Sequence, residues 1–152
     1  MNMTRNRFKW ETRGKAHEGN IVKGEKYRFT ILTTRLIRME FSDEGTFEDR
    51  ATQSFFYRDF EKNEYHVKRE EGVLTIETSE LLLTYVENSI FSAETLSVRL
   101  KNFPGSQWRF GQTTEQLKGT ACTLDNINGA VALEDGVISR NGYTVILSLI
   151  HI

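Results

Sequence analysis

Acidic side chains are the residues in this sequence whose type and spacing come closest to a catalytic pattern. Four adjacent pairs occur, Asp43/Glu44, Glu48/Asp49, Glu70/Glu71 and Glu134/Asp135. Glycoside hydrolysis uses two carboxyl groups that lie about 5–5.5 Å apart in retaining enzymes and further apart in inverting ones. Adjacent residues of a strand point to opposite faces, so such neighbours do not form a catalytic pair by themselves. We interpret them as turn and surface acids and assign no catalytic residue in this chain.

Other reactive residues give no motif. The histidines, His17, His66 and His151, are widely spaced and form no H-x-x-x-H pattern, so no metal site is expected. Cys122 is the only cysteine, which excludes an internal disulfide, and we interpret it as a small buried hydrophobic residue. No G-x-S-x-G elbow and no phosphate-binding glycine loop occurs, so no cofactor is expected.

The overall charge is nearly balanced. Twenty basic residues stand against twenty-one acidic ones, so no basic field favours nucleic acid or an anionic membrane as a partner. No segment approaches the run of about 20 apolar residues that spans a bilayer, and the polar N-terminus lacks the apolar run of a signal peptide. We therefore expect a soluble cytoplasmic protein whose 152 residues suffice for one domain with a core.

Hydrophobic residues follow the periodicity of strands. Tyr27, Phe29 and Ile31 alternate with polar residues, and the same period of two recurs in residues 36–41. Further strands are predicted for residues 65–68, 73–77, 81–86 and 96–100, and turn-length gaps separate three of them. No window has a helical stripe, so little helix is expected. The pattern predicts an all-β, antiparallel β-sandwich whose strands have one dry face and one wet face.

Two segments fit this meander of hairpins poorly. Gly45–Glu64 combines charges with an aromatic cluster, and Gly105–Gly136 contains five glycines with scattered apolar residues. Long irregular segments of a compact domain are either functional loops or long connections, and the sequence leaves both interpretations open.

Several segments together resemble one known family. Residues 119–125 read Gly-Thr-Ala-Cys-Thr-Leu-Asp, and residues 133–143 read Leu-Glu-Asp-Gly-Val-Ile-Ser-Arg-Asn-Gly-Tyr. They resemble the G-T-x-R-T-L-D and L-x-x-G-[IL]-x-S-R-x-G-[WY] patterns in the N-terminal domain of family 31 glycoside hydrolases. Residues 28–33 with 36–40 are similar to the opening strand pair of that family, and residues 47–53 to the segment that follows. The resemblance runs from about Asn20 to Ile146.

The resemblance implies a galactose-mutarotase-like sandwich that precedes a catalytic (β/α)8 barrel. It further implies a retaining mechanism on α-linked glucosides, with both catalytic aspartates on the barrel, where loops after the strands build the site. The expected partners are thus the barrel of the same parent chain and, in the parent, an α-glucoside-type carbohydrate. Asp125 and Arg140 are candidates for sugar contact because both can hydrogen-bond hydroxyl groups. The alternatives are a turn-capping aspartate and a surface or ion-paired arginine. Trp10 and Trp108 could stack on a sugar ring or belong to the core.

The sequence departs from the family pattern at two places. Cys122 occupies the usual position of an arginine, where it either alters the sugar site or stands at a structural surface position. After Ile146 the usual acidic pair is replaced by Leu-Ser-Leu-Ile-His-Ile. One coding of this hexapeptide matches the end of a transposase adaptor used to prepare sequencing libraries. We therefore interpret residues 147–152 as a non-native tail, although residues 145–152 could instead form a closing strand.

The predicted organisation is a lead-in over residues 1–19, an incomplete sandwich over residues 20–146 and the tail over residues 147–152. Missing final strands leave backbone edges unpaired, so residues 1–146 are expected to be marginally stable or insoluble alone. The favoured function is a non-catalytic module of an α-glycosidase. One alternative is a stand-alone carbohydrate-binding module, which needs exposed aromatic residues on a sandwich face. Another is a mutarotase-like epimerase, which needs His17 or His66 to meet a carboxylate in a groove.

Overall fold

The computed structural model describes residues 11–113, 116–119, 125 and 128–148. These residues form short strands and a three-residue 3-10 helix, which confirms the predicted all-β class. The elements are η1 (Glu18–Asn20), β1 (Ile21–Lys23), β2 (Tyr27–Thr33), β3 (Leu36–Phe41), β4 (His66–Glu70), β5 (Val73–Glu77), β6 (Leu81–Val86), β7 (Leu96–Leu100), β8 (Gln107–Arg109), β9 (Gln116–Lys118) and β10 (Asp135–Ser139). Within the described ranges, no helix has the length and apolar character needed to cross a membrane.

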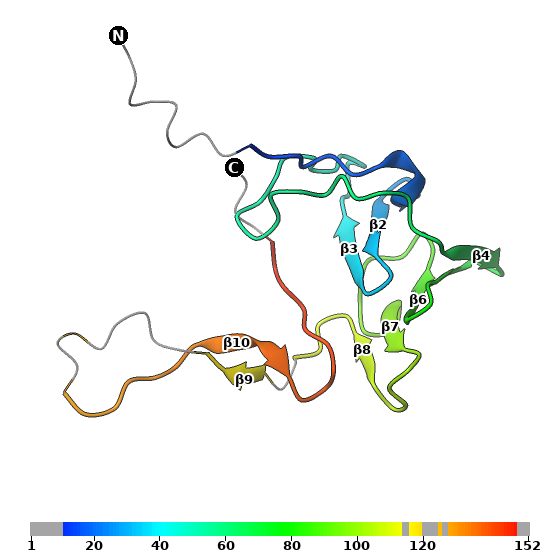
Figure 1. Ribbon diagram of the computed structural model, residues 1–152. Helices are drawn as coiled ribbons and strands as arrows, with labels where there is room; N and C mark the ends of the chain where they lie inside the picture. Colours follow the sequence, from blue (N-terminus) through cyan, green and yellow to red (C-terminus); the bar gives the residue numbers. More distant parts are fainter. Residues whose placement is uncertain (1–10, 114–115, 120–124, 126–127, 149–152) are drawn as a thin grey trace, which may run out of the picture.

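The strands form three antiparallel sheets (Figure 1). One sheet has the order β1-β2-β3, and a larger one has the order β4-β5-β6-β7-β8. The third is a two-stranded ribbon of β9 and β10, which projects from the other sheets and which we call the arm. All six strands predicted from the alternation occur as β2–β7, with the third beginning at His66 rather than Tyr65.

Tight turns set the register of the larger sheet. Glu70 pairs with Val73, so only Glu71 and Gly72 connect β4 to β5. Both have positive φ, 50° and 77°, which is the geometry of a type I′ turn and matches the twist of the flanking strands. Between β7 and β8, Gly105 has a φ of 83° and the amide of Ser106 donates to the carbonyl of Phe103 at 3.1 Å. Pro104 and Gly105 therefore occupy the central positions of a type II turn.

The core lies between the three-stranded and five-stranded sheets. Phe29 and Ile31 of β2 face Leu74, Ile76, Leu83 and Tyr85 of β5 and β6, and all six are fully buried. The rings of Phe29 and Tyr85 meet edge to face with centroids 5.4 Å apart, a favourable arrangement for aromatic pairs. Trp108 is buried in the same core, so the core interpretation of this residue is confirmed. The two sheets form a sandwich that does not close into a barrel.

The prediction that one face of β2 is exposed to solvent is wrong. Arg28 and Thr30 alternate with the core residues, yet they are only 6% and 1% exposed. The irregular segment 45–64 runs across this outer face and takes the place of solvent, with Ala51, Thr52 and Arg58 buried against the sheet. Strand β2 is therefore buried on both faces, which a period-two pattern does not distinguish from a half-exposed strand.

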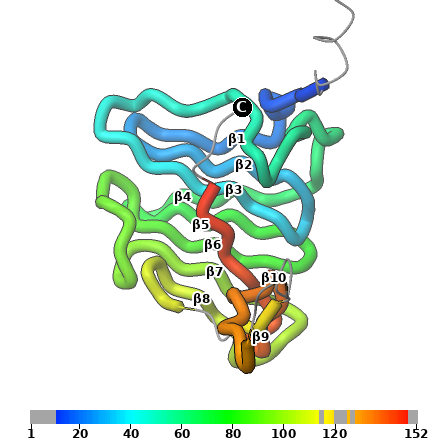
Figure 2. The backbone as a smooth tube through the Cα atoms, turned by 90° about the vertical axis from the view of Figure 1, so that its left-hand side faces the viewer, coloured from blue at the N-terminus to red at the C-terminus, as the bar shows by residue number. Residues whose placement is uncertain are grey.

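A C-terminal segment crosses the open side of the sandwich. Residues 141–148, which we call the strap, run past the strands of both sheets (Figure 2). Tyr143 and Val145 pack against the core, and the hydroxyl of Ser148 donates to that of Thr52 at 2.7 Å. Residues 145–148 form no strand, Leu147 is exposed, and the rest of the predicted tail or closing strand lies outside the described residues.

Candidate functional site

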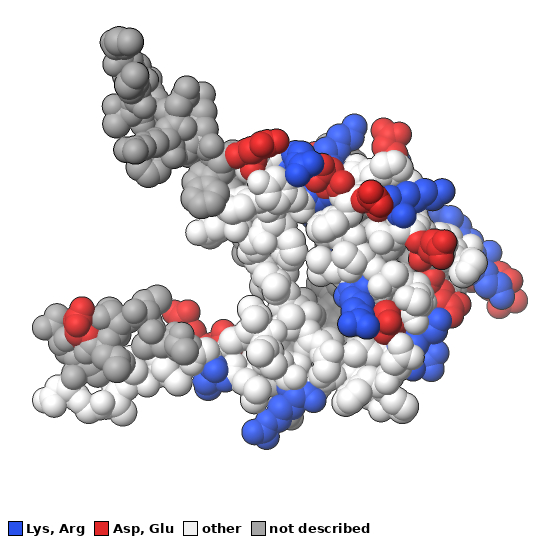
Figure 3. Space-filling model, in the orientation of Figure 1, with Lys and Arg blue, Asp and Glu red and all other residues white. Residues whose placement is uncertain are grey.

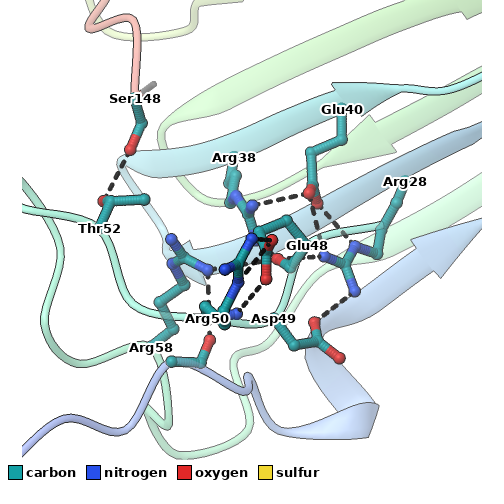
Figure 4. Close-up of polar contacts among 10 residues, drawn as sticks. Arg28, Arg38, Glu40, Glu48, Asp49, Arg50, Thr52, Arg58 and Ser148 are labelled. Atoms are coloured by element: carbon teal, nitrogen blue, oxygen red, sulfur yellow. Dashed lines mark hydrogen bonds and ion pairs between the residues drawn. The ribbon is translucent and has the colours of Figure 1, made fainter. Parts of the chain in front are cut away.

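Charged side chains collect on the outer face of the three-stranded sheet, beneath the segment 45–64. Strand β2 supplies Arg28, and β3 supplies Arg38 and Glu40. The covering segment supplies Glu48, Asp49 and Arg58 (Figure 4). We call these six residues the polar cluster. All but Arg58 fall in the segments that carry the family resemblance, so residues from separate stretches of sequence meet in one place.

Arg28 is the most completely bonded member of the cluster. Its Nε donates to Glu40 Oε2 at 2.6 Å and its Nη2 to Glu40 Oε1 at 3.0 Å, which is a bidentate pair. Its Nη1 donates to Asp49 Oδ1 at 2.6 Å, and Nη2 also reaches the Glu48 carbonyl at 2.9 Å. Bidentate and charge-assisted bonds of this kind are the strong class, so Arg28 ties β2, β3 and the covering segment together.

Three guanidinium groups converge on the Glu48 carbonyl oxygen. Besides Arg28, this oxygen accepts from Arg38 Nη1 at 2.8 Å and from Arg58 Nη1 at 3.5 Å. Arg38 also pairs with Glu40 through Nη2 at 2.7 Å. Arg58 has a second long bond, 3.4 Å to the Gly14 carbonyl, while its buried Nη2 has no hydrogen-bond partner among the residues described.

The arginines of the cluster differ in how burial and neighbouring charges shift their pKa. Burial lowers the pKa of Arg38 to about 10, with the neighbouring Arg58 and Arg28 adding to the decrease and Glu40 opposing it. Burial likewise lowers the pKa of Arg58. Burial acts in the same direction on Arg28, but its hydrogen bonds to Glu40 and Asp49 outweigh it and raise the pKa. The charged form of Arg28 is thus stabilised by its partners, whereas burial disfavours the charged forms of Arg38 and Arg58.

An open pocket of about 400 Å³ borders the cluster. Arg28, Phe47 and Asp49 form one part of its wall, and the guanidinium carbon of Arg28 lies 5.1 Å from the centroid of the Phe47 ring. The remaining lining residues are Lys15, Glu18, Ile21 and Lys23. Carboxylates and ammonium groups around an aromatic ring can bind a hydroxyl-rich or charged ligand through hydrogen bonds.

The arm pairs β9 with β10 and places Gly119, the first residue of one C-terminal motif, beside the other motif. Asp135 pairs with Lys118 and Ser139 with Gln116, and the Gly119 amide donates to the Glu134 carbonyl at 2.7 Å. The strands approach closely at Gly136, where a Cβ would lie 2.8 Å from the Leu117 carbonyl oxygen. The glycine of this motif is therefore required by the neighbouring backbone.

The predicted sugar-contact residues lie at opposite ends of the arm. Asp125 is exposed in the connection that follows β9, and Arg140 is exposed immediately after β10, where the chain returns toward the sandwich. The structure does not bring these side chains together in one site. Trp10, Cys122 and His151 lie outside the described residues.

Neither described histidine lines the pocket beside Arg28. His17 Nδ1 accepts from the Gly19 amide at 3.0 Å and so caps η1, and His66 begins the exposed strand β4. Neither lines the smaller pocket beneath the strap either. In the part of the chain that the structure describes, no group of three or more histidine, cysteine and acidic side chains is placed to hold a metal ion.

Sequence reasoning missed the polar cluster. The period of two in residues 27–31 and 36–41 predicts a solvent-exposed face for Arg28, Arg38 and Glu40, and the pair Glu48/Asp49 is predicted at the surface. Asp49 is half exposed, but its carboxylate also binds Arg28. The available signal was the long segment 45–64, whose aromatic residues and charges suit a layer over a sheet better than a free loop. Comparisons of the chain with known protein families and with curated protein sequences find no match.

Proposed function

We propose that this chain is the N-terminal β-sandwich module of a retaining α-glycosidase related to family 31 glycoside hydrolases. In this proposal the module is non-catalytic, and the rest of the parent chain supplies a (β/α)8 barrel that hydrolyses α-linked glucosides. The sandwich packs on the barrel and shapes its entrance. The family-like segments support this proposal, because their described residues supply five members of the polar cluster and the whole of β10 in the arm.

The observation that carries the proposal is the exposed apolar surface of the arm. Val137 and Ile138 of β10 are 69% and 65% exposed, in a stretch where the pairing with β9 is irregular. Leu117, Val131 and Leu133 add to this surface. A two-stranded ribbon is marginal in water, and exposed apolar groups of this size mark interaction surfaces. Charged side chains gather mainly on the side of the sandwich that faces away from the arm (Figure 3), and the two strands of the arm carry the Lys118–Asp135 ion pair.

The first test is to amplify and sequence the source DNA across the 3′ end of the reading frame. A frame that continues beyond Ile146 for several hundred residues would support the proposal, and the full-length product should then hydrolyse aryl α-glucosides. In that product, Val137→Glu with Ile138→Glu should reduce activity and thermal stability, while Lys68→Glu on the exposed strand β4 should change neither. A genuine stop codon after Ile152 would contradict the proposal.

A stand-alone carbohydrate-binding module is the second candidate, and the pocket at Phe47 favours it. Its aromatic ring and mixed charges offer both packing and hydrogen bonds to a sugar. Isothermal titration of the chain with maltooligosaccharides tests this candidate. Binding that Phe47→Ala removes would support it, whereas binding that persists in this variant, or no binding at all, would count against it.

A further inference from the structure

The polar cluster contains more buried positive charge than negative charge. Arg28, Arg38 and Arg58 provide three guanidinium groups, and Glu40 and Asp49 provide two carboxylates that contact them. The Glu48 carboxylate is 29% exposed; it accepts from Arg50 Nε at 2.9 Å and from the Arg50 amide at 2.7 Å, and its charge also acts on Arg58. With Arg50 counted, four guanidinium groups stand against the carboxylates of Glu40, Glu48 and Asp49, so one excess positive charge remains.

The excess charge resides at Arg58. This residue is 1% exposed, its two hydrogen bonds are long, and its Nη2 has no acceptor among the described residues. A buried charge that is not paired costs several kcal/mol unless a partner compensates it. Arg28 does not share this deficit because all of its nitrogens donate to oxygens within 3.0 Å. The unused donor is therefore specific to one side of the cluster.

The strap approaches the same side. Ser148 reaches Thr52, which lies in the covering segment four residues beyond Glu48, and Figure 4 shows both on the Arg58 side of the cluster, away from Arg28. Four residues of extended chain span at most about 14 Å, which limits how far the Thr52 backbone lies from the Glu48 carbonyl that the guanidinium groups share. A carboxylate carried on a segment at this position, or a small anion beneath it, would meet the excess charge.

We propose that Arg58, with Arg38 beside it, forms a binding site for one oxyanion of the carboxylate or phosphate class. The planar fork of a guanidinium fits two oxygens of such a group, and Nη2 of Arg58 is the donor left for it. The anion comes either from solution or from an acidic side chain of polypeptide that packs over Thr52. This site is independent of the proposed glycosidase role.

Two sets of measurements on the full chain distinguish these sources. The first measures thermal unfolding in sodium phosphate and in sodium acetate against sodium chloride at equal ionic strength, for the wild type and for Arg58→Met. Above the dissociation constant, each tenfold rise in phosphate should multiply the folding constant of the wild type about tenfold, because the anion binds only the folded state. Arg58→Met should retain only the general salt effect, which serves as the control.

The second set places a carboxylate on the strap. Ser148→Asp should stabilise the chain relative to Ser148→Asn, which has the same shape without the charge, and Arg58→Met should abolish the difference. Arg58-dependent phosphate stabilisation indicates a dissolved anion, whereas a gain confined to Ser148→Asp indicates a side-chain carboxylate. Equal responses with and without Arg58 in both sets would overturn the proposal.

If Arg58→Met fails to fold, NMR of the wild type gives the answer. The guanidinium signals of Arg58 should shift saturably as phosphate or acetate is added, while those of the exposed Arg50 should not. Signals of Arg58 that stay unchanged, together with no stabilisation by Ser148→Asp over Ser148→Asn, would also overturn the proposal.

Discussion

Arg28 and Arg58 offer a direct comparison, because two buried arginines of one cluster should contribute very differently to stability. Replacing Arg28 with methionine leaves Glu40 and Asp49 without their main partner. Breaking a buried ion pair from one side costs about 3–5 kcal/mol. Glu40 keeps its bond to Arg38, and the Asp49 side chain is 48% exposed, so solvent offsets part of this loss. We expect Arg28→Met to lower the free energy of unfolding by about 3 kcal/mol, at the lower end of that range.

Arg58→Met should give the opposite result for the same change of side chain. It removes two hydrogen bonds of 3.4 and 3.5 Å together with a buried charge that lacks a full partner. Apolar replacements of such groups are often neutral or stabilising. We expect its free energy of unfolding to lie within about 1 kcal/mol of the wild type, on the stabilising side.

Urea unfolding at pH 7 measures both variants, and equal m-values show that the free energies can be compared. For a chain of this size, a loss of about 3 kcal/mol corresponds to a decrease of about 6–12 °C in the melting temperature. Arg50→Met is the control, because this exposed arginine pairs only at the surface, and it should leave the midpoint unchanged. If Arg58→Met destabilises the chain as much as Arg28→Met, the assignment of the excess charge to Arg58 is wrong.

Three further predictions concern the arm, a turn and the tyrosines. Gly136→Ala should separate the two strands of the arm and lower the free energy of unfolding by about 1–3 kcal/mol, because the added Cβ overpacks against the neighbouring backbone. Gly119→Ala places its Cβ 3.4 Å from the nearest atom, so it should change hydrogen exchange of the Lys118 amide much less than Gly136→Ala does. Glu71→Asn should stabilise the chain by about 0.5–1 kcal/mol in urea unfolding, because asparagine tolerates the φ of 50° in this turn, and Glu71→Ala should not. Burial raises the pKa of Tyr65 above 10.0, so its stabilising contribution is complete below that pH and is lost as pH rises through the higher folded value. Thermal unfolding from pH 8 to 11 should therefore show a decrease above about pH 10, and Tyr65→Phe should make that decrease shallower; an identical slope would contradict this assignment.

The strands of the sandwich could be predicted because their information is local. Alternation in residues 27–31 and 73–86 fixes both the strands and the face that each turns to the core. The two-residue turn Glu71-Gly72 fixes the register between β4 and β5, as hairpin geometry requires. None of these features depends on a distant segment, which is why the residues alone were sufficient.

The polar cluster and the arm depend on distant contacts, and the sequence pattern does not contain them. Arg58 is buried because its segment folds back over β2 and meets the carbonyls of Gly14 and Glu48. Strand β9 has only three residues, and its partner follows after a long connection, so neither shows a period that identifies a strand. For the same reason Asp125 and Arg140 could be selected from a motif, but their separation along the arm could not be foreseen.

The strap gives this domain a fixed order of assembly during synthesis on the ribosome. The sheets pair mainly through neighbouring strands, so they can form as the chain emerges. Ile37, Met39 and Val98 line the groove that the strap covers, but Tyr143 and Val145 leave the ribosome later. At about 5–20 residues per second, the roughly 32 residues between Trp108 and the strap take about 2–6 s to synthesise. An apolar groove is open for that interval, so nascent chains halted before Tyr143 should be the form that chaperones retain.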